Sequence, residues 1–406
     1  MLTNVFEGFD AEFAMITCSG VGPNNHICKR YYQMTDSMMI SNILHRTKVG
    51  RVLFYEDYPK NPNRSDTYEG AKNIVPGNLL RLLREIAWKL AKWDKRGIAD
   101  FVTEFNPDVI YAPCQSLHYM IRLVKYVAKT ANVPVISYVS DDNYTNKHYS
   151  FSPLFWANHF LIRKHLREIF KVYSLCYTMT DEQKAQCERD FGTRMKILRK
   201  SGTFAEDDQK KDVNHPIRIV YAGNLLYNRY KTLQTLVRNL RMLNQDSVKM
   251  TLNIYSNTRL KENDVSLLND GKSSFLHGVV SMAELKEIYK KSDIALHVEA
   301  FDKANKYAVR MSFSTKIIDC LDSGCAVMAI CDKDQAGGAY LRRNGCAICV
   351  NDLKELFPTL KEIVNNPRQL IALQLKAFEV GRKNHLEENI KHDFYQDFVD
   401  VVVGKY

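Results

Sequence analysis

The sequence predicts an α/β protein made of two Rossmann-like domains that face each other across a cleft. The chain has 406 residues, which is longer than an ordinary single domain and long enough for two domains. Short apolar, β-branched runs alternate with longer amphipathic segments, as in parallel βα units. The alternation stops once, at the polar segment 201–216, which predicts a linker between residues 1–205 and 206–385. The tail, 386–406, predicts a closing helix that packs back on the first domain.

The first domain shows two long helical patterns and six strand candidates. Apolar residues recur at helical spacing over 77–105 and 116–132, which predicts one helix in each segment. The expected strands are EFAMITC at 12–18, GRVLFYE at 50–56, DVIYAP at 108–113, PVISYVS at 134–140, VYSLCYTM at 172–179 and MKILRKSG at 195–202.

The second domain repeats this order of elements. Helical spacing predicts helices over 231–244, 281–292 and 314–324. The expected strands are IRIVYAG at 217–223, KMTLNIYS at 249–256, SFLHGVV at 274–280, DIALHVE at 293–299, CAVMAI at 325–330 and CAICV at 346–350.

The opening of the chain differs from that of an ordinary doubly wound domain, which begins with a central strand and a glycine-rich turn. Leu2, Val5, Phe6 and Phe9 recur at helical spacing, so we expect the chain to begin inside a helix. The segment 12–18 is then the second strand of the fold. We therefore expect a first domain that lacks its opening strand and packs weakly there.

The chain carries a formal net charge of +11, which requires an anionic partner. The cations are dispersed and no nucleic-acid-binding motif accompanies them, so we expect no nucleic acid. No uncharged apolar stretch reaches eighteen residues, and the ten cysteines are scattered, which predicts a cytoplasmic protein. Cys346 and Cys349 form a CxxC inside a strand-like run without a second Cys or His pair, so we expect buried thiols and neither metal nor cofactor.

The window 308–330, AVRMSFSTKIIDCLDSGCAVMAI, places hydroxyls and cations at a predicted helix start. Free N–H groups at such a start favour a diphosphate, and Asp319, one turn further on, is placed to accept hydrogen bonds from a ribose diol. The alternative is that Ser314 or Thr315 only caps the helix and Asp319 only favours its dipole. The candidate phosphate-binding residues are Arg310, Ser312, Ser314, Thr315 and Lys316.

The stretch KIIDCLDSGCAVMA, residues 316–329, resembles the K-x-x-E-x-x-x-x-G-x-P-V-x-A signature of GT-B glycosyltransferases, especially family 4 and related bacterial capsular and surface-polysaccharide enzymes. The likeness runs from about residue 217 to 384. It implies a nucleotide-sugar-dependent glycosyltransferase whose second domain binds the donor and whose first domain faces the acceptor. Asp319 falls on the family's ribose-binding glutamate and Gly324 on its glycine.

Two positions depart from the family's pattern. The family has a second glutamate eight residues before the ribose ligand, where this chain has Met311. The nearest upstream acid is Glu299, at the end of a predicted strand, where a carboxylate is placed to bind hydroxyls of the donor sugar. Asp319 is also one methylene shorter than the family's glutamate.

The start of the second domain resembles the family's glycine loop and its basic diphosphate clamp. A strand ends at Gly223 and Asn224, and Arg229 follows six residues after the glycine. A glycine lets a nucleotide approach the backbone, and Arg229 or Lys231 is placed to neutralise the leaving diphosphate. The alternative is a plain turn followed by two solvated cations.

Three polar residues of the first domain are candidates for the acceptor side. Asp141 and Asp142 follow a predicted strand, where sheet crevices bind ligands, and are placed to orient or deprotonate an acceptor hydroxyl. The alternative is an aspartate pair that makes a turn or caps a helix. His118 lies at a strand-to-helix junction, where a structural role is the alternative.

Two helical segments, 79–95 and 160–170, combine cations with aromatic and aliphatic residues. They suggest a basic amphipathic face that brings the protein to a membrane surface carrying a lipid-linked acceptor. The alternative is that the apolar stripes are core and the cations face water.

Together these features predict transfer of a sugar from a nucleoside-diphosphate sugar to an acceptor hydroxyl of a surface polysaccharide or a lipid-linked oligosaccharide. The resemblance implies retention of the anomeric configuration. The alternatives are a non-hydrolysing nucleotide-sugar epimerase and a non-catalytic nucleotide-sugar-binding protein. The expected catalytic residues are Asp141, Asp142, Arg229, Glu299 and Lys316.

Overall fold

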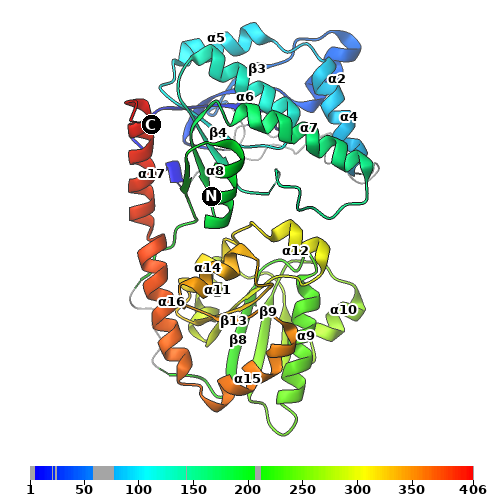
Figure 1. The fold of residues 1–406 in the computed structure, drawn as a ribbon, viewed down its shortest axis with the longest axis vertical. Helices are drawn as coiled ribbons and strands as arrows, with labels where there is room; N and C mark the ends of the chain where they lie inside the picture. The colour runs from blue at the N-terminus through cyan, green and yellow to red at the C-terminus, as the bar shows by residue number, and fades with distance from the viewer. Residues whose placement is uncertain are drawn as a thin grey trace.

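The structure is a computed structural model that describes residues 5–20, 22, 25–57, 77–142, 144–205 and 212–405. Figure 1 shows two lobes, the first half of the chain above and residues from β8 onward below, with the C-terminal helices running along one side. Each lobe contains parallel β-sheet flanked by helices, as the sequence predicts.

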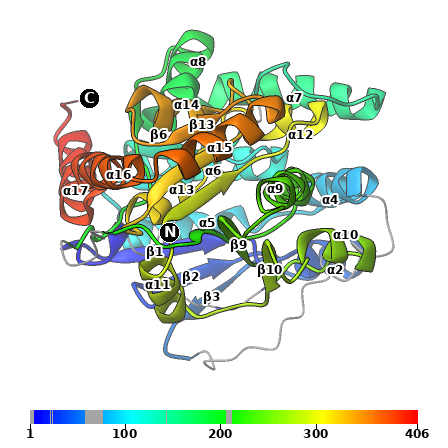
Figure 2. The ribbon, with the colours of Figure 1, turned by 90° about the horizontal axis from the view of Figure 1, so that it is seen from below.

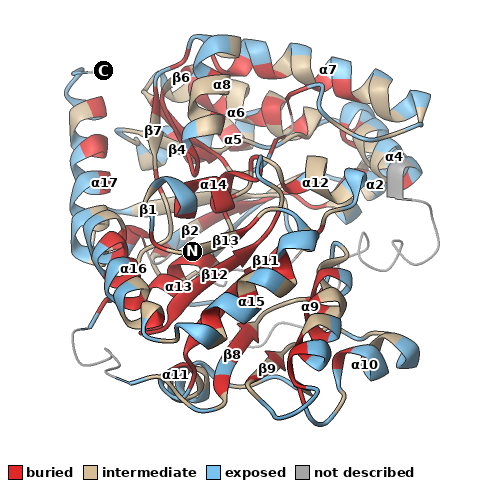
Figure 3. Cartoon of the chain, turned by 60° about the horizontal axis from the view of Figure 1, so that its bottom comes forward, coloured by how far each residue is buried: buried red, intermediate tan, exposed pale blue. Residues whose placement is uncertain are grey.

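The second domain is built on a six-stranded, fully parallel sheet with the strand order β10-β9-β8-β11-β12-β13. In order of appearance along this domain, that is 3-2-1-4-5-6, the order of dinucleotide-binding sheets. Every residue of β11 and β12 is buried, so helices cover both faces of the sheet (Figure 3). The strands are β8 (Ile217–Ala222), β9 (Met250–Tyr255), β10 (Ser274–His277), β11 (Ile294–Val298), β12 (Ala326–Ile330) and β13 (Ile348–Val350).

Two separate apolar clusters bury the two faces of this sheet. One face packs against α9 (Arg229–Leu243), α10 (Glu262–Leu268) and α15 (Leu356–Asn365). The other face packs against α11 (Met282–Lys290), α13 (Lys316–Leu321), α14 (Ala336–Arg343) and α16 (Gln369–His385). The remaining short elements are α12 (Lys303–Val309) and a 3-10 turn, η2 (Leu353–Glu355).

The described residues of the first domain form two sheets instead of one. A parallel sheet has the order β4-β5-β6-β7, and a three-stranded sheet has the order β1-β2-β3 with β3 antiparallel. Within the described residues, β1 is hydrogen-bonded to β2 alone, and none of its five residues is fully buried. The strands are β1 (Phe13–Thr17), β2 (Cys28–Gln33), β3 (Arg51–Phe54), β4 (Ile110–Pro113), β5 (Val135–Val139), β6 (Tyr173–Thr178) and β7 (Met195–Ile197).

The described chain begins with a short helical turn at Val5 and Phe6, and Leu2 lies outside the described residues. The weak packing expected around the first strand stays a prediction: the residues of β1 are half-buried, whereas Val5 and Phe6 before it are buried in an apolar cluster. The strand β2 was not expected, because its sequence, CKRYYQ, places charges among its aromatic residues.

The helix predicted over residues 77–105 is wrong as a single element. It divides into α4 (Gly77–Leu90) and α5 (Lys95–Phe105), because the Asp94 side chain accepts a hydrogen bond from the Gly97 N–H at 2.9 Å and starts a new helix. The other helices of this domain are α2 (Asp36–His45), α6 (His118–Ala131), α7 (Pro153–Ile169) and α8 (Asp181–Phe191).

The last two helices run along both domains. α16 packs on the second domain, and α17 (Glu387–Val402) lies along the first (Figure 1). The Tyr177 hydroxyl donates to Asp397 at 2.7 Å, and the Phe6 ring contacts Phe394 and Phe398. Figure 2 shows α16 and α17 at the edge of the molecule opposite α4 and α10.

Candidate active site

The carboxyl ends of β8 and β11 form the centre of the site. These strands are neighbours, and the strand order reverses between them, which is where doubly wound sheets bind ligands. The chain leaves β8 at Gly223 and β11 at Glu299. Tyr227 and Asn228 adopt left-handed backbone conformations, with φ of 57° and 60°, and turn the chain so that α9 begins at Arg229.

Arg229 and Glu299 form a buried two-point ion pair. The guanidinium Nε and Nη2 donate to the two carboxylate oxygens at 2.9 and 3.0 Å, and Nη1 donates to Asn224 Oδ1 at 2.7 Å. Burial opposes the charge, but the bonds and negative charge of Glu299 outweigh it and raise the pKa of Arg229. Glu299 therefore fixes the position of Arg229, and both carboxylate oxygens of Glu299 accept hydrogen bonds from Arg229.

Lys316 reaches the same place from the start of α13. Its Nζ lies 3.4 Å from the Tyr221 hydroxyl, and its side chain crosses over Gly223 so closely that a Cβ there would stand 1.8 Å from Nζ. Burial and the positive charge of Arg229 lower the pKa of Lys316 to about 8. Two cations thus converge beside a strand end, and an anionic ligand there would relieve their repulsion.

The hydroxyls expected at the phosphate site lie beside Lys316. Ser314 and Thr315 are half-buried, and the Thr315 side chain makes no capping hydrogen bond although it holds the cap position of α13. Capping is therefore not the role of the Thr315 hydroxyl in this structure. Because α13 has only six residues, its dipole adds little, and Arg229 and Lys316 supply most of the positive charge. The backbone of Ser312 is fixed by bonds to Val309 and Gln335.

The two aspartates of the 316–329 window have different surroundings. Asp319 is about one third exposed and forms an ion pair with Lys200. Asp322 accepts hydrogen bonds from the backbone N–H groups of Thr203 and Phe204 at 3.1 and 2.7 Å, and burial raises its pKa. Asp322 thus anchors the segment after β7, whereas Asp319 faces a more open position.

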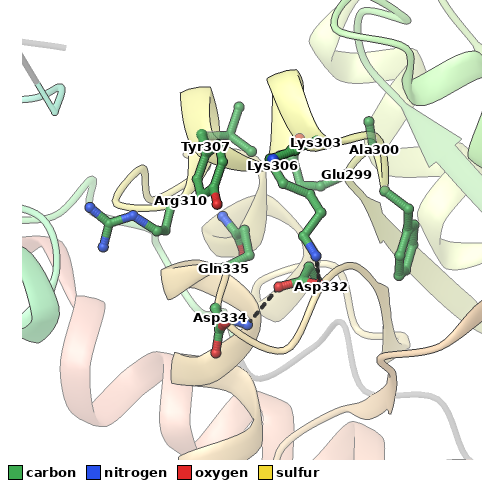
Figure 4. Close-up of a pocket in the computed structure, with 11 residues that line it drawn as sticks. Glu299, Ala300, Lys303, Lys306, Tyr307, Arg310, Asp332, Asp334 and Gln335 are labelled. Carbon is green, nitrogen blue, oxygen red and sulfur yellow. Dashed lines mark hydrogen bonds and ion pairs between the residues drawn. The ribbon is translucent and has the colours of Figure 1, made fainter. Parts of the chain in front are cut away.

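A cavity of about 220 Å³ adjoins Glu299. It lies between the end of β11, α12 and the start of α14, and Lys306 forms an ion pair with Asp332 in its wall (Figure 4). Its polar lining includes Glu299, Lys303, Lys306, Tyr307, Arg310 and Gln335. The cavity extends the charged centre with side chains suited to hydroxyl-rich ligands.

Arg310 bridges the two domains. Its Nη2 donates to Asp142 Oδ2 at 2.8 Å, and Asp142 also accepts from the backbone N–H and hydroxyl of Thr145 at 3.0 and 2.6 Å. The Asp142 carboxylate is 2% exposed, so its hydrogen-bond partners in this arrangement are Arg310 and Thr145 rather than water. Asp141 is exposed and accepts only the Ser140 hydroxyl, at 3.0 Å, among the bonds described for its side chain.

His118 lies apart from the two converging cations. Its Nδ1 is 3.0 Å from His165 Nδ1 and its Nε2 is 3.2 Å from Asn158 Oδ1, which fixes the ring between α6 and α7. The neighbouring Asn158 lines a second cavity, of about 90 Å³, between α4 and α7. That cavity also takes its lining from Arg81, Glu85, Ser116, His148 and His159.

Two histidines of the α4–α7 cavity were not expected from the sequence. The rings of His148 and His159 lie 4.9 Å apart, and burial lowers the pKa of both, so they are neutral at pH 7. Their Nε2 atoms have no hydrogen-bond partner in the part of the chain that the structure describes. No periodic pattern or motif marks these two histidines, since they come together only through the packing of α7.

Solved structures share this arrangement over most of the chain. The sucrose-phosphate synthase of Thermosynechococcus elongatus matches with a TM-score of 0.58 and 12% identity over 96% of this chain and 98% of that one. The α,α-trehalose 6-phosphate synthase of Burkholderia multivorans matches with a TM-score of 0.56 and 12% identity over 84% and 85%. The chain has the GT-B fold. No protein-family model and no curated protein matches the sequence.

A third GT-B structure, Anabaena HepE in complex with UDP, matches with a TM-score of 0.55 and 14% identity over 75% of this chain and 82% of that one. Identities this low establish the fold alone. The resemblance seen at residues 316–329 thus led to the correct fold, while the roles of the individual residues still rest on their geometry.

Within this GT-B fold, the remaining sequence candidates lie as follows. Lys231 is the third residue of α9 and is exposed, with its Nζ over the Tyr230 ring and not beside Lys316 as Arg229 is. Cys346 is buried before β13 and Cys349 is half-buried within it, and both thiols contact backbone carbonyls. Among the described residues, no group of three or more His, Cys, Asp or Glu side chains is arranged to hold a metal ion.

Proposed function

We propose that the chain is a glycosyltransferase that moves a sugar from a nucleoside-diphosphate sugar to an acceptor hydroxyl. The observation that carries this proposal is the convergence of Arg229 and Lys316 beside the end of β8, at the point where the strand order reverses. HepE, which shares the fold, is in complex with UDP. A leaving diphosphate requires such a concentration of positive charge.

In the proposed reaction, the bond between the anomeric carbon and the diphosphate oxygen breaks, and its electron pair leaves with the diphosphate. Arg229 and Lys316 neutralise that charge, with Gly223 leaving room for the Lys316 side chain and Asn224 holding Arg229. The acceptor oxygen forms the new bond to the anomeric carbon and loses its proton. Following the resemblance, we propose that the anomeric configuration is retained.

The other donor-side residues have supporting roles in this proposal. Asp319 binds the ribose after exchanging its ion pair with Lys200 for the diol. Glu299 acts as a positioning residue, because both of its oxygens hold Arg229 rather than facing a sugar. The hydroxyls that complete the phosphate site in this proposal are those of Ser312, Ser314 and Thr315, whereas Arg310 stays paired with Asp142.

The acceptor side is proposed to lie in the first domain, within residues 1–205. Asp141 is exposed and is the better candidate to take the acceptor's proton, whereas Asp142 is committed to Arg310 and Thr145. The cavity between α4 and α7 offers imidazole and amide groups suited to sugar hydroxyls, with His118 holding Asn158 in its wall. The acceptor we propose is a growing surface polysaccharide or a lipid-linked oligosaccharide at a membrane surface.

The test is release of nucleoside diphosphate from a panel of nucleotide sugars, with and without lipid-linked and polysaccharide acceptors. The proposal expects release that requires an acceptor and persists in EDTA, because protein cations hold the diphosphate. Conversion of the nucleotide sugar without an acceptor would support the epimerase instead. Binding without turnover in every combination would support a non-catalytic binding protein.

A further inference from the structure

Helix α4 turns its apolar side outward. Five of its apolar side chains are between 39% and 65% exposed. They recur at intervals of three and four residues, so they form one continuous stripe along the helix. No helix among the described residues is long and apolar enough to cross a bilayer, so the stripe is not part of a membrane span. The stripe consists of Leu79, Leu82, Leu83, Ile86 and Leu90.

Two charged side chains of the same helix, Arg84 and Glu85, are held by partners within the protein. Arg84 Nε donates to Asp36 at 2.9 Å, and Glu85 accepts the backbone N–H of His118 at 2.9 Å. Trp88, one turn further along, is fully buried and its Nε1 donates to Asp36. An ordinary surface helix has the opposite arrangement, with its apolar stripe in the core and its charges in water. For α4, the sequence-based alternative of a core stripe holds for the buried Leu80 and Trp88, but the five exposed apolar side chains lie outside that core.

Helix α2 extends the apolar area. Ile40, Ile43 and Leu44 are between 42% and 68% exposed. The two helices are tied together, because Asn42 Oδ1 accepts the Lys92 N–H at 2.9 Å. We call these eight residues, the three on α2 and the five on α4, the α2–α4 surface. An exposed apolar area of this kind marks a binding surface.

The charges around the α2–α4 surface are positive. Arg46, Lys89 and Lys92 are exposed at the C-terminal ends of the two helices, and Lys48 is exposed but forms an ion pair with Asp94 at 2.9 Å. The acidic residues of segments 36–50 and 77–96 all have partners inside the protein. They are Asp36, which holds Arg84, Glu85, which holds α6, and Asp94, which caps α5.

We propose that the α2–α4 surface docks on an anionic lipid bilayer, with the leucine stripe in the interface and the cations on the headgroups. A second copy of the chain fits less well, because a symmetric contact would bring the two positive rims together. The cavity between α4 and α7 shares Leu82 with this surface and has Leu154 in its other wall. Docking therefore presents that cavity to a lipid-linked acceptor, a step that rests on the proposed function.

The experiment is co-flotation of the full chain with phosphatidylcholine vesicles, with and without phosphatidylglycerol. We expect binding to the anionic vesicles that weakens with salt and falls about tenfold or more in the double variant Leu83→Gln, Ile86→Gln. The matched control is Val279→Gln, Met282→Gln, whose parent side chains are 75% and 66% exposed on the second domain. The control should float like the original chain, and thermal unfolding should show that both variants are folded.

Equal flotation of the Leu83 and Ile86 variant and the original chain would overturn the proposal, as would no binding to anionic vesicles. A dimer in sedimentation that this variant dissociates would show that the surface joins two copies. Nucleoside-diphosphate binding should be the same in all these variants. If the original chain floats but binds no nucleotide, the docking stands and the proposed function fails.

Discussion

Arg310 of the second domain donates to Asp142 of the first domain at 2.8 Å, and both side chains are largely buried, at 15% and 2% exposure. The pair joins two residues for which the sequence predicts opposite substrates, Arg310 for the donor phosphates and Asp142 for the acceptor. Its charges neutralise each other in this arrangement, so it holds the two domains together at the edge of the site.

Removing the acidic half of this pair should destabilise the protein. Asp142→Asn leaves the Arg310 charge buried without its partner, which costs about 3 kcal/mol of unfolding free energy. Asp141→Asn changes an exposed neighbour and should stay within about 0.5 kcal/mol. Urea denaturation of the two variants measures the difference. Equal stabilities would mean that water, and not the Asp142 carboxylate, stabilises the positive charge of Arg310.

A methyl group at Gly223 should displace Lys316. The added Cβ would stand 1.8 Å from Nζ, so Gly223→Ala should weaken nucleoside-diphosphate binding about tenfold or more without changing any charge. Gly345→Ala is the matched control, because Gly345 also has a positive φ, of 59°, but nothing within 4 Å of its added Cβ. Calorimetric titration should show weaker binding only for Gly223→Ala. Equal affinities of the two variants would mean that Lys316 does not bind the nucleoside diphosphate.

The pH dependence of binding should report Lys316. Its pKa is lowered to about 8, so the ammonium is mostly charged at pH 7 and mostly neutral at pH 9. The affinity for a nucleoside diphosphate should therefore fall about tenfold as the pH rises from 7 to 9. Lys316→Arg keeps its charge over this range and should flatten the profile. An unchanged slope in that variant would assign the titration to another group.

The two aspartates of the 316–329 window should separate binding from stability. Asp319→Asn should weaken nucleotide binding, because the side chain proposed to accept hydrogen bonds from the ribose hydroxyls loses its negative charge. Asp322→Asn should instead lower the unfolding free energy, because its carboxylate holds the backbone of Thr203 and Phe204. Parallel titration and denaturation of both variants make the comparison. A similar loss of binding in the two would show that only the negative charge of the segment matters.

Acid should destabilise the protein through buried histidines. Burial lowers the pKa of His385 to about 3, below the value of about 6.5 in an unfolded chain. The unfolded state then binds more protons than the folded state below pH 6.5, so the free energy of unfolding falls as the pH drops from 7 to 5. His385→Gln should show a shallower fall, and an identical slope would assign the effect to other groups.

The sequence was most informative where local pattern decides structure. Twelve apolar runs predicted twelve of the thirteen strands in the described part of the chain, because buried parallel strands are continuous β-branched runs. The strand β2 was missed, since Lys29 and Arg30 interrupt its apolar residues. Asp94 was read as part of a helix because capping depends on backbone geometry that spacing does not show.

The candidate site was predictable in its position but not in its pairings. The order of the motifs placed Gly223, Arg229 and Lys316 at strand and helix ends, and the fold brings them together. The partner of Glu299 was not foreseen, because Arg229 lies seventy residues away in the chain and the contact depends on the neighbouring positions of β8 and β11. Tyr221 likewise had no signal beyond its place in a strand.

The central claim is that Arg229 and Lys316 form the binding site for a nucleoside diphosphate. It is tested most directly by calorimetric titration of the full chain with UDP, GDP, ADP and dTDP, repeated with Arg229→Ala and Lys316→Ala. The account predicts that at least one of these diphosphates binds and that each variant loses about 2 kcal/mol or more of binding free energy. No binding by any of the four, or equal affinity in the original chain and both variants, would contradict it.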